Sequence, residues 1–187
     1  MVKRILLVGA AAIALSGCGA GENNGTTAPV GSNSGNHAGH SDMNHSVSGE
    51  LPPSLKEAAN PKFEVGSQAL LIADHMEGME AAEATIAGAY DTIVYAVSYT
   101  PTTGGKPVEN HKWVIQEEIQ DAADRPYEPG EKVVLKADHM KGMKGAVATI
   151  DSAEAGTVYA VDYTPAAGGE PVKNHKWVTE SELSPMP

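Results

Sequence analysis

The feature that most constrains this chain is an internal repeat. Residues 63–118 align without a gap on residues 127–182 at an offset of 64, and 31 of the 56 aligned pairs are identical. A unit of this size has a marginal core by itself. We therefore expect two domains, 61–120 and 125–184, that pack against each other or share structure more intimately.

Each copy has the pattern of short strands. Residues 94–99 (VYAVSY) and 158–163 (VYAVDY) carry Tyr, Val and Tyr at alternate positions, the two-residue period of a half-buried strand. Segments 101–105 (PTTGG) and 165–169 (PAAGG) have turn chemistry. No long amphipathic helix is indicated. The predicted fold class is mainly β, a tandem repeat of two small SH3-like barrels.

The first residues have the order of a bacterial export signal. Lys3 and Arg4 precede an apolar run over 5–15, which is too short to span a bilayer. The following sequence LSGC resembles a lipobox, which implies that 1–17 is a lipoprotein signal peptide and that Cys18 becomes a lipidated N-terminus. Two acyl chains would anchor the protein stably to the outer face of the cell membrane. Because Cys18 is the only cysteine, an internal disulfide is excluded.

Charge and motifs narrow the function classes. Without Lys3 and Arg4 the chain has 11 basic against 24 acidic side chains, a formal charge of −13, which argues against nucleic acid or anionic lipid as a partner. No Ser-His-Asp signature, phosphate-binding loop or zinc protease motif is present. We therefore expect a protein that is not an enzyme.

Residues 18–60 are predicted to be a flexible, disordered tether, because they are rich in Gly, Asn, Ser and Thr and have few large apolar residues. Three histidines and one methionine gather within it. A short tract of this composition indicates auxiliary metal binding, and a solvated linker explains it equally well. The residues concerned are His37, His40, Met43 and His45.

Two further blocks are kept in both copies and carry soft metal ligands. DHMEGM at 74–79 matches DHMKGM at 138–143, and NHKWV at 110–114 matches the same letters at 174–178. Thioether sulfur and imidazole nitrogen suit Cu(I) ahead of Cu(II), with zinc as an alternative through imidazole. The predicted ligands are His75, Met76, Met79 and His111 in the first copy, and His139, Met140, Met143 and His175 in the second. Asp74 and Asp138 are predicted to hydrogen-bond the ligand imidazoles and fix their tautomers.

Each of these residues also has a structural interpretation. Methionine fills irregular cores, and a buried histidine is often only hydrogen-bonded. The two tryptophans, Trp113 and Trp177, are expected to be core anchors. The metal interpretation gains from the coincidence of so many ligand types in two unchanged blocks and again in the tether.

The motifs HMxGM, AxxTI, YAVxYTP, GGxPV and NHKWV, present twice behind a lipobox, resemble the YdhK family of bacterial lipoproteins, which includes CopL-type copper-resistance surface proteins. The resemblance covers residues 61–183. It implies copper binding outside the cytoplasmic membrane, as protection against excess metal. The expected partner is a copper exporter or a cell-wall component. The competing expectation is a surface-anchored SH3-like module that binds cell-wall polymer or a protein through its Tyr and Trp faces, independently of metal.

Overall fold

A computed structural model describes residues 51–187 of the chain. The predicted signal peptide, the lipidation site Cys18 and the four tether residues His37, His40, Met43 and His45 lie outside the described residues. The described residues contain strands and two short 3-10 turns but no α-helix, which confirms the predicted β class. None of their elements is a helix of the length and apolarity that crossing a membrane requires.

The strands belong to one sheet in which β4, β7 and β1 branch from the path β5-β6-β3-β2-β8. In chain order the elements are β1 (Lys56–Glu57), β2 (Gln68–Leu71), β3 (Glu83–Tyr99), β4 (Val108–Ile115), η1 (Gln116–Glu118), β5 (Lys132–Val134), β6 (Val147–Tyr163), β7 (Val172–Thr179), η2 (Glu180–Glu182) and β8 (Leu183–Pro185). β5, β6 and β7 have the strands β2, β3 and β4 as counterparts at equivalent positions of the first copy, whereas the counterpart of β8 is the isolated bridge between Ile119 and Leu135.

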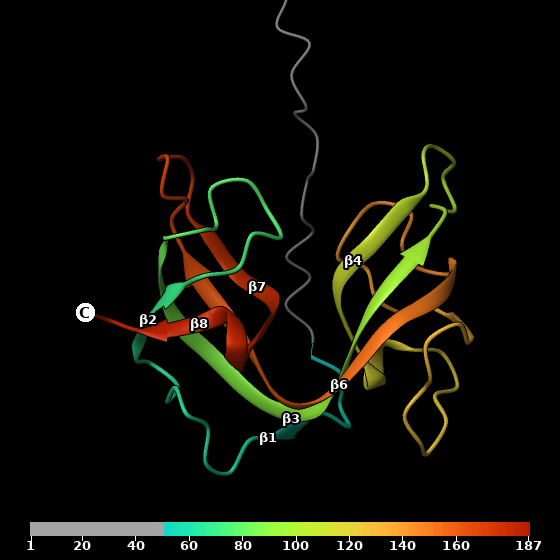
Figure 1. Cartoon of the computed structure of the whole chain (residues 1–187), viewed down its shortest axis with the longest axis horizontal. Coiled ribbons are helices and arrows are strands. Elements are labelled where there is room, and N and C mark those ends of the chain that lie inside the picture. Colours follow the sequence, from blue (N-terminus) through green and yellow to red (C-terminus); the bar gives the residue numbers. More distant parts are fainter. Residues whose placement is uncertain (1–50) are drawn as a thin grey trace, which may run out of the picture. The chain divides into compact units, whose positions relative to one another are not determined.

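The long strands β3 and β6 form the centre of the sheet (Figure 1). They pair antiparallel from Ala84 opposite Tyr163 to Tyr99 opposite Ala148, so the start of each strand meets the end of the other. Each strand has 17 residues, far more than the alternating segment that the sequence singled out. Polar residues extend the pairing through the middle, where the Thr157 hydroxyl donates to Asp91 at 2.8 Å.

One end of this ribbon carries the group of elements that we call lobe A. It consists of β2, the first half of β3, the second half of β6, β7 and β8. Its core combines residues of both copies. The fully buried members include Leu71, Met79 and Ile86 from the first copy and Tyr159, Val161 and Val178 from the second.

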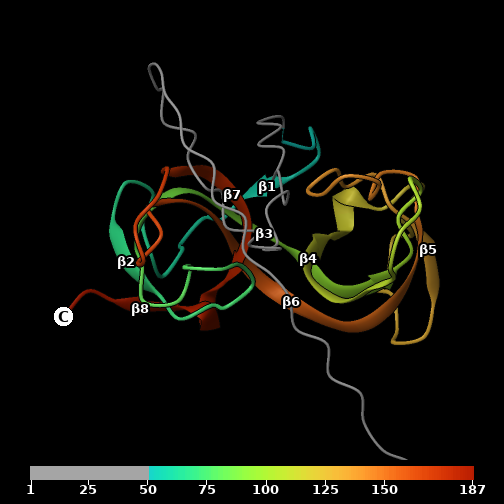
Figure 2. The same ribbon diagram turned by 90° about the horizontal axis from the view of Figure 1, so that it is seen from above.

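The other end carries lobe B, with the roles of the copies exchanged (Figure 2). It consists of the second half of β3, β4, β5 and the first half of β6. Tyr95, Val97 and Val114 of the first copy pack there against Leu135, Met143 and Ile150 of the second. The predicted domains 61–120 and 125–184 are therefore sequence repeats and not the spatial units, because each lobe draws its core from both copies.

A third apolar cluster lies where β3 and β6 run past each other between the lobes. Trp113 is 8% exposed and Trp177 is fully buried in it, as expected for core anchors. The peptide bonds that precede both tryptophans are cis. Their membership of this cluster places both indoles between the lobes, within reach of elements from either one.

Loops from different copies also contact each other. Ala166 donates its N–H to the carbonyl of Gly78 at 2.9 Å, and Thr102 donates to the carbonyl of Gly142 at the same distance. Gly78 has a φ of +75°, and a Cβ built on it would lie 2.9 Å from the Cβ of Pro165. Glycine is required at this position both for its backbone conformation and for the close approach of the other copy.

The substitution Gly78→Ala should lower the free energy of unfolding by more than the roughly 1–2 kcal/mol that a left-handed conformation costs an L-residue, because the new methyl also displaces Pro165. Gly66→Ala is the matched control. Gly66 has a φ of +87° with open space around it, so only the conformational cost applies. Urea unfolding measures both variants, and equal losses would contradict the proposed contact.

Candidate metal centres

The structure brings the histidines and one methionine of each DHM block into two clusters. Site A comprises His75 and Met76 from the first copy with Tyr163, His175 and Glu182 from the second. Site B comprises the equivalent residues with the copies exchanged, namely His139, Met140, Tyr99, His111 and Glu118. The histidine and methionine of each DHM block lie in the loop between two strands, β2–β3 in lobe A and β5–β6 in lobe B.

Glu182 holds the imidazole of site A. Its Oε1 lies 2.5 Å from Nε2 of His75, and both side chains are well buried, with 5% of the His75 side chain and 13% of the Glu182 side chain exposed. Oε2 accepts hydrogen bonds from the indole of Trp113 at 2.8 Å and from Thr179, whose N–H and hydroxyl lie at 2.9 and 3.0 Å. The ring of Trp113 also packs edge-on against His75, with 6.1 Å between centroids.

Site B repeats the arrangement with fewer donors. Nε2 of His139 lies 2.8 Å from Oε1 of Glu118. The other carboxylate oxygen accepts from the indole of Trp177 at 3.0 Å and from the N–H of Ile115 at 3.2 Å. Ile115 is the counterpart of Thr179 but has no hydroxyl, so the carboxylate of site B depends more on its tryptophan.

These hydrogen bonds determine which ring nitrogen is available to a ligand. An ionised carboxylate accepts only from a protonated nitrogen, so in the neutral imidazoles Nε2 carries the proton and Nδ1 carries the lone pair. The Nδ1 atoms of His75 and His139 are buried and have no hydrogen-bond partner among the described residues. A buried acceptor without a partner is costly, and a bound metal ion is one way to satisfy it.

A tyrosine joins the remaining donors of each site. The hydroxyl of Tyr99 lies 3.9 Å from the sulfur of Met140, and the Tyr99 ring packs edge-on against His111 at 6.1 Å. The rings of His111 and His139 are also 6.1 Å apart. Burial raises the pKa of the Tyr99 phenol, so the hydroxyl stays protonated. In site B, Tyr99 therefore contacts both Met140 and His111, and His111 in turn lies beside His139.

Site A repeats the two contacts of its tyrosine. The hydroxyl of Tyr163 lies 3.6 Å from the sulfur of Met76, and its ring packs against His175 at 5.9 Å. Burial likewise raises the pKa of the Tyr163 phenol. Among residues 51–187 no three His, Cys, Asp or Glu side chains are placed to hold a metal ion.

The structure corrects the grouping of the predicted ligands. From the sequence, His111 is predicted to join the first copy's DHM block, whereas the structure places it beside His139 of the second copy. His175 packs against Tyr163, whose hydroxyl faces Met76 of the first copy. The reason is the exchange of halves between the copies, which an alignment of one copy on the other does not reveal.

Two other expectations about these blocks also change. Met79 and Met143 are fully buried in the cores of lobes A and B, the environment of a packing methionine, and we leave them out of sites A and B. Asp74 and Asp138 are exposed, and the hydrogen bonds expected of them come from Glu182 and Glu118. That glutamate is identical in the two copies, so the repeat comparison contained the signal that could have found it.

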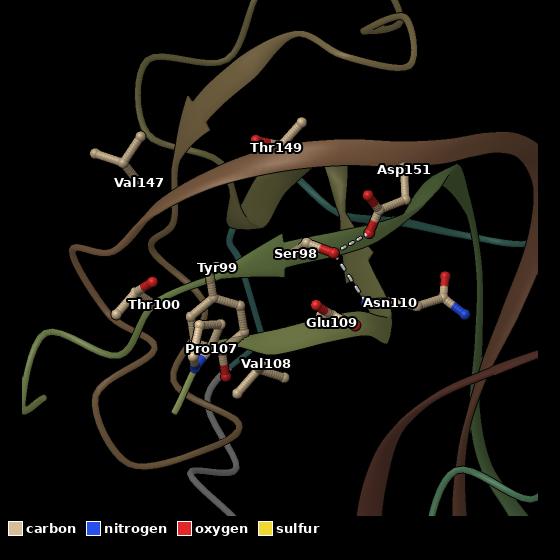
Figure 3. Close-up of a pocket in the computed structure, with 10 residues that line it drawn as sticks. All are labelled: Ser98, Tyr99, Thr100, Pro107, Val108, Glu109, Asn110, Val147, Thr149 and Asp151. Atoms are coloured by element: carbon tan, nitrogen blue, oxygen red, sulfur yellow. Dashed lines mark hydrogen bonds between the residues drawn. The ribbon is translucent and has the colours of Figure 1, made fainter. Parts of the chain in front are cut away.

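A separate surface pocket of about 430 Å³ lies on lobe B (Figure 3). Ser98 forms its polar centre, donating to Asp151 at 2.7 Å and accepting from the N–H of Asn110 at 3.0 Å. Tyr99 contributes to the pocket wall as well as to site B. The remaining lining is mixed and partly exposed, and it adds no ligand type to site B.

The buried carboxylates make stability depend on pH. Burial raises the pKa of Glu182, but hydrogen bonds from His75, Thr179 and Trp113 outweigh burial and hold the pKa at about 2, below its ordinary 4.5. The same competition, with His139 and Trp177 as partners, lowers the pKa of Glu118. The folded state therefore favours the charged form of both groups.

We expect the contribution of ionised Glu182 to the free energy of unfolding to be complete above pH 4.5 and to be lost as the pH falls toward 2. Glu182→Gln should lower the free energy of unfolding at pH 7 by about 1.5–3 kcal/mol, the worth of hydrogen bonds to a charged group. The difference between the unfolding free energies of wild type and variant, measured in urea from pH 7 to 2, should shrink across this window. A constant difference would contradict the assignment.

The fold and the two clusters define a class: a duplicated β protein in which each His/Met cluster draws on both copies. The chain belongs to the family described as "Protein of unknown function (DUF1541)", whose model matches residues 65–116 and 129–180. It is similar to the "Uncharacterized protein YdhK" of Bacillus subtilis (strain 168), with 58% identity over 170 residues that cover 91% of this chain and 82% of the relative.

Solved structures of the Bacillus subtilis protein are also similar. A crystal structure at 2.00 Å resolution shares 61% identity with a TM-score of 0.76, covering 79% of this chain and all of the other. A second crystal structure shares 64% identity with a TM-score of 0.64, covering 65% of this chain and 99% of the other. A solution NMR structure described as its C-terminal domain shares 64% identity with a TM-score of 0.63, covering 66% of this chain and 93% of the other.

Proposed function

We propose that this protein is not an enzyme and that it binds copper outside the cytoplasm, one Cu(I) ion in each lobe, to sequester the metal or hand it on. The observation that carries the proposal is the buried Nδ1 of His75 and of His139. Neither has a hydrogen-bond partner within residues 51–187, and each ring is oriented by a carboxylate on the opposite nitrogen. Metal-ligating histidines commonly have this outer hydrogen bond.

The spacing of the donors supports a shared ion. Because imidazole nitrogen binds a first-row metal at about 2.0–2.1 Å, two imidazoles on one ion hold their ring centroids roughly 5 to 6 Å apart. The centroids of His111 and His139 are separated by 6.1 Å. Met140, next to His139 in the chain, supplies a sulfur beside Tyr99, the ring that packs on His111.

The donor types favour Cu(I) among the candidate ions. Two imidazoles and one thioether form a neutral, soft set that excludes Mg²⁺ and Ca²⁺. Zinc prefers a tetrahedral site with four donors, one more than the three that each site offers. With no charged ligand in the set, an ion could be passed to a stronger acceptor. The acidic surface, from a chain with 24 Asp and Glu against 13 Lys and Arg, would attract cations from solution.

The methionines provide a matched test. Met76→Leu combined with Met140→Leu removes both candidate sulfurs and conserves volume, at a cost in stability that is usually below about 1.5 kcal/mol per site. We expect at least a tenfold loss of Cu(I) affinity, measured by competition with a chromophoric chelator under reducing conditions. Met79→Leu combined with Met143→Leu makes the same change at the buried core positions and should leave the affinity intact.

Two outcomes would contradict the proposed sites. One is unchanged Cu(I) affinity in the Met76/Met140 variant, which would remove those sulfurs from the ligand set. The other is a selective loss in the Met79/Met143 variant, which would return the core methionines to it. The tether residues His37, His40, Met43 and His45 add donors of the same types. Both variants are therefore measured in two backgrounds, one with the natural tether and one in which the three histidines are Ser and the methionine is Leu.

We also propose that the protein is exported, lipidated at Cys18 and anchored to the outer face of the cell membrane, where a copper exporter or a cell-wall component is its partner. The support is the order of charged start, short apolar run and LSGC sequence. Labelling growing cells with a palmitate analogue should mark the wild-type protein, while Cys18→Ala should remain unlabelled and be recovered outside the membrane fraction. Equal labelling would contradict the assignment of Cys18.

For the finer fold we propose two SH3-like barrels, one in each lobe. Short strands surround a separate apolar core at each end of the β3–β6 ribbon, which is the arrangement expected of small barrels. Each barrel would have to be completed by strands of the other copy.

A further inference from the structure

We infer that the tryptophan on the closing strand of each lobe positions the candidate metal ligand of the opposite lobe. Trp113 lies on β4 of lobe B, yet its indole N–H donates to Glu182, the carboxylate that holds His75 of site A. Trp177 lies on β7 of lobe A and donates to Glu118, which holds His139 of site B. The inference rests on the proposed function for its metal-binding consequence and deepens it.

The contacts show how the position is set. One oxygen of Glu182 accepts from His75, and the other is fixed by its own donors, so the carboxylate cannot rotate without losing them. A carboxylate with a fixed orientation also fixes the imidazole and the direction of its Nδ1 lone pair. Trp113 adds a direct edge contact to the ring of His75, with 6.1 Å between centroids. The tryptophan therefore acts on the metal ligand through the glutamate and through packing.

The two sites differ in how much they depend on this contact. In site A the Thr179 N–H and hydroxyl also bond the oxygen that accepts from Trp113. In site B the described part of the chain gives the corresponding oxygen, besides Trp177, one longer hydrogen bond from the N–H of Ile115, at 3.2 Å. Loss of the indole N–H should therefore disturb site B more than site A.

The test uses the full chain with Trp113→Phe and Trp177→Phe. In the metal-free protein, ¹⁵N chemical shifts of the imidazoles report which nitrogen carries the proton. Trp113→Phe should change the shifts of His75 and leave those of His139, while Trp177→Phe should change His139 and leave His75. Changes confined to the histidine of the same lobe, or equal changes in both, would overturn the inference.

The metal-bound readout uses Ag(I), a closed-shell soft ion that resembles Cu(I), and follows the methionine methyl signals. The signals of Met76 and Met140 report sites A and B separately in one molecule. We expect Trp177→Phe to weaken Ag(I) binding at Met140 about tenfold or more, the usual effect of losing an outer hydrogen bond, and Trp113→Phe to weaken binding at Met76 by less. Weakening that follows the tryptophan's own lobe would contradict the crossed assignment.

A second variant and the two readouts distinguish a failure to fold, a failure of the proposed function and a failure of the positioning inference. If either phenylalanine variant fails to fold, benzothienylalanine at the same position keeps the shape of the indole and replaces only its N–H by sulfur, and the same crossed pattern is expected. If the metal-free pattern is crossed but Ag(I) and Cu(I) do not bind, the proposed function fails while the positioning stands. If metal binds and the pattern is not crossed, the positioning fails while the proposed function stands.

Discussion

The pairing of β3 with β6 is the interaction on which the rest of the structure depends. Its register runs from Ala84 opposite Tyr163 to Tyr99 opposite Ala148. Because 84 and 148 are equivalent positions of the two copies, as are 99 and 163, the register is unchanged when the copies are exchanged. This pseudo-two-fold symmetry places the first half of one copy beside the second half of the other at both ends, and it determines which residues can share a core.

The same symmetry explains why the chemistry crosses between copies. A DHM loop follows the first strand of its copy, whereas the NHKWV segment belongs to the closing strand of the opposite copy in the same lobe. His139 therefore meets His111, and the buried glutamate that holds each imidazole comes from the copy that did not supply the histidine. Neither cluster could be assembled from one copy folded on itself in the predicted way.

The sequence predicted the features that depend on residue type and local period. The β class, the strand around residues 94–99 and the buried tryptophans follow from alternation and turn chemistry, and the structure contains them. The ligand types were also evident. The partners were not, because an alignment shows that two segments are equivalent without showing whether they pair within a copy or between copies.

The hydrogen-bond partner of each histidine was also not predictable from the sequence. Asp74 is adjacent to His75 in sequence and was the natural choice for its partner. In a strand-to-loop segment, however, neighbouring side chains point apart, and the residue that reaches Nε2 is Glu182, which lies 107 positions away. Glu182 and Glu118 are identical residues at equivalent positions of the repeat, which made them candidates for a role. Only the fold shows that each of them contacts a histidine of the other copy.

The exchange of halves between the copies also determines when each lobe can fold as the chain emerges. Any chain that emerges N-terminus first, from a ribosome or through a membrane pore, exposes the apolar face of its leading copy until the trailing copy arrives, because β8 (Leu183–Pro185) is needed to finish lobe A around β2. Covalent linkage keeps the local concentration of the trailing copy high. The exposed apolar face of the leading copy therefore pairs with the trailing copy of its own chain before it contacts another molecule.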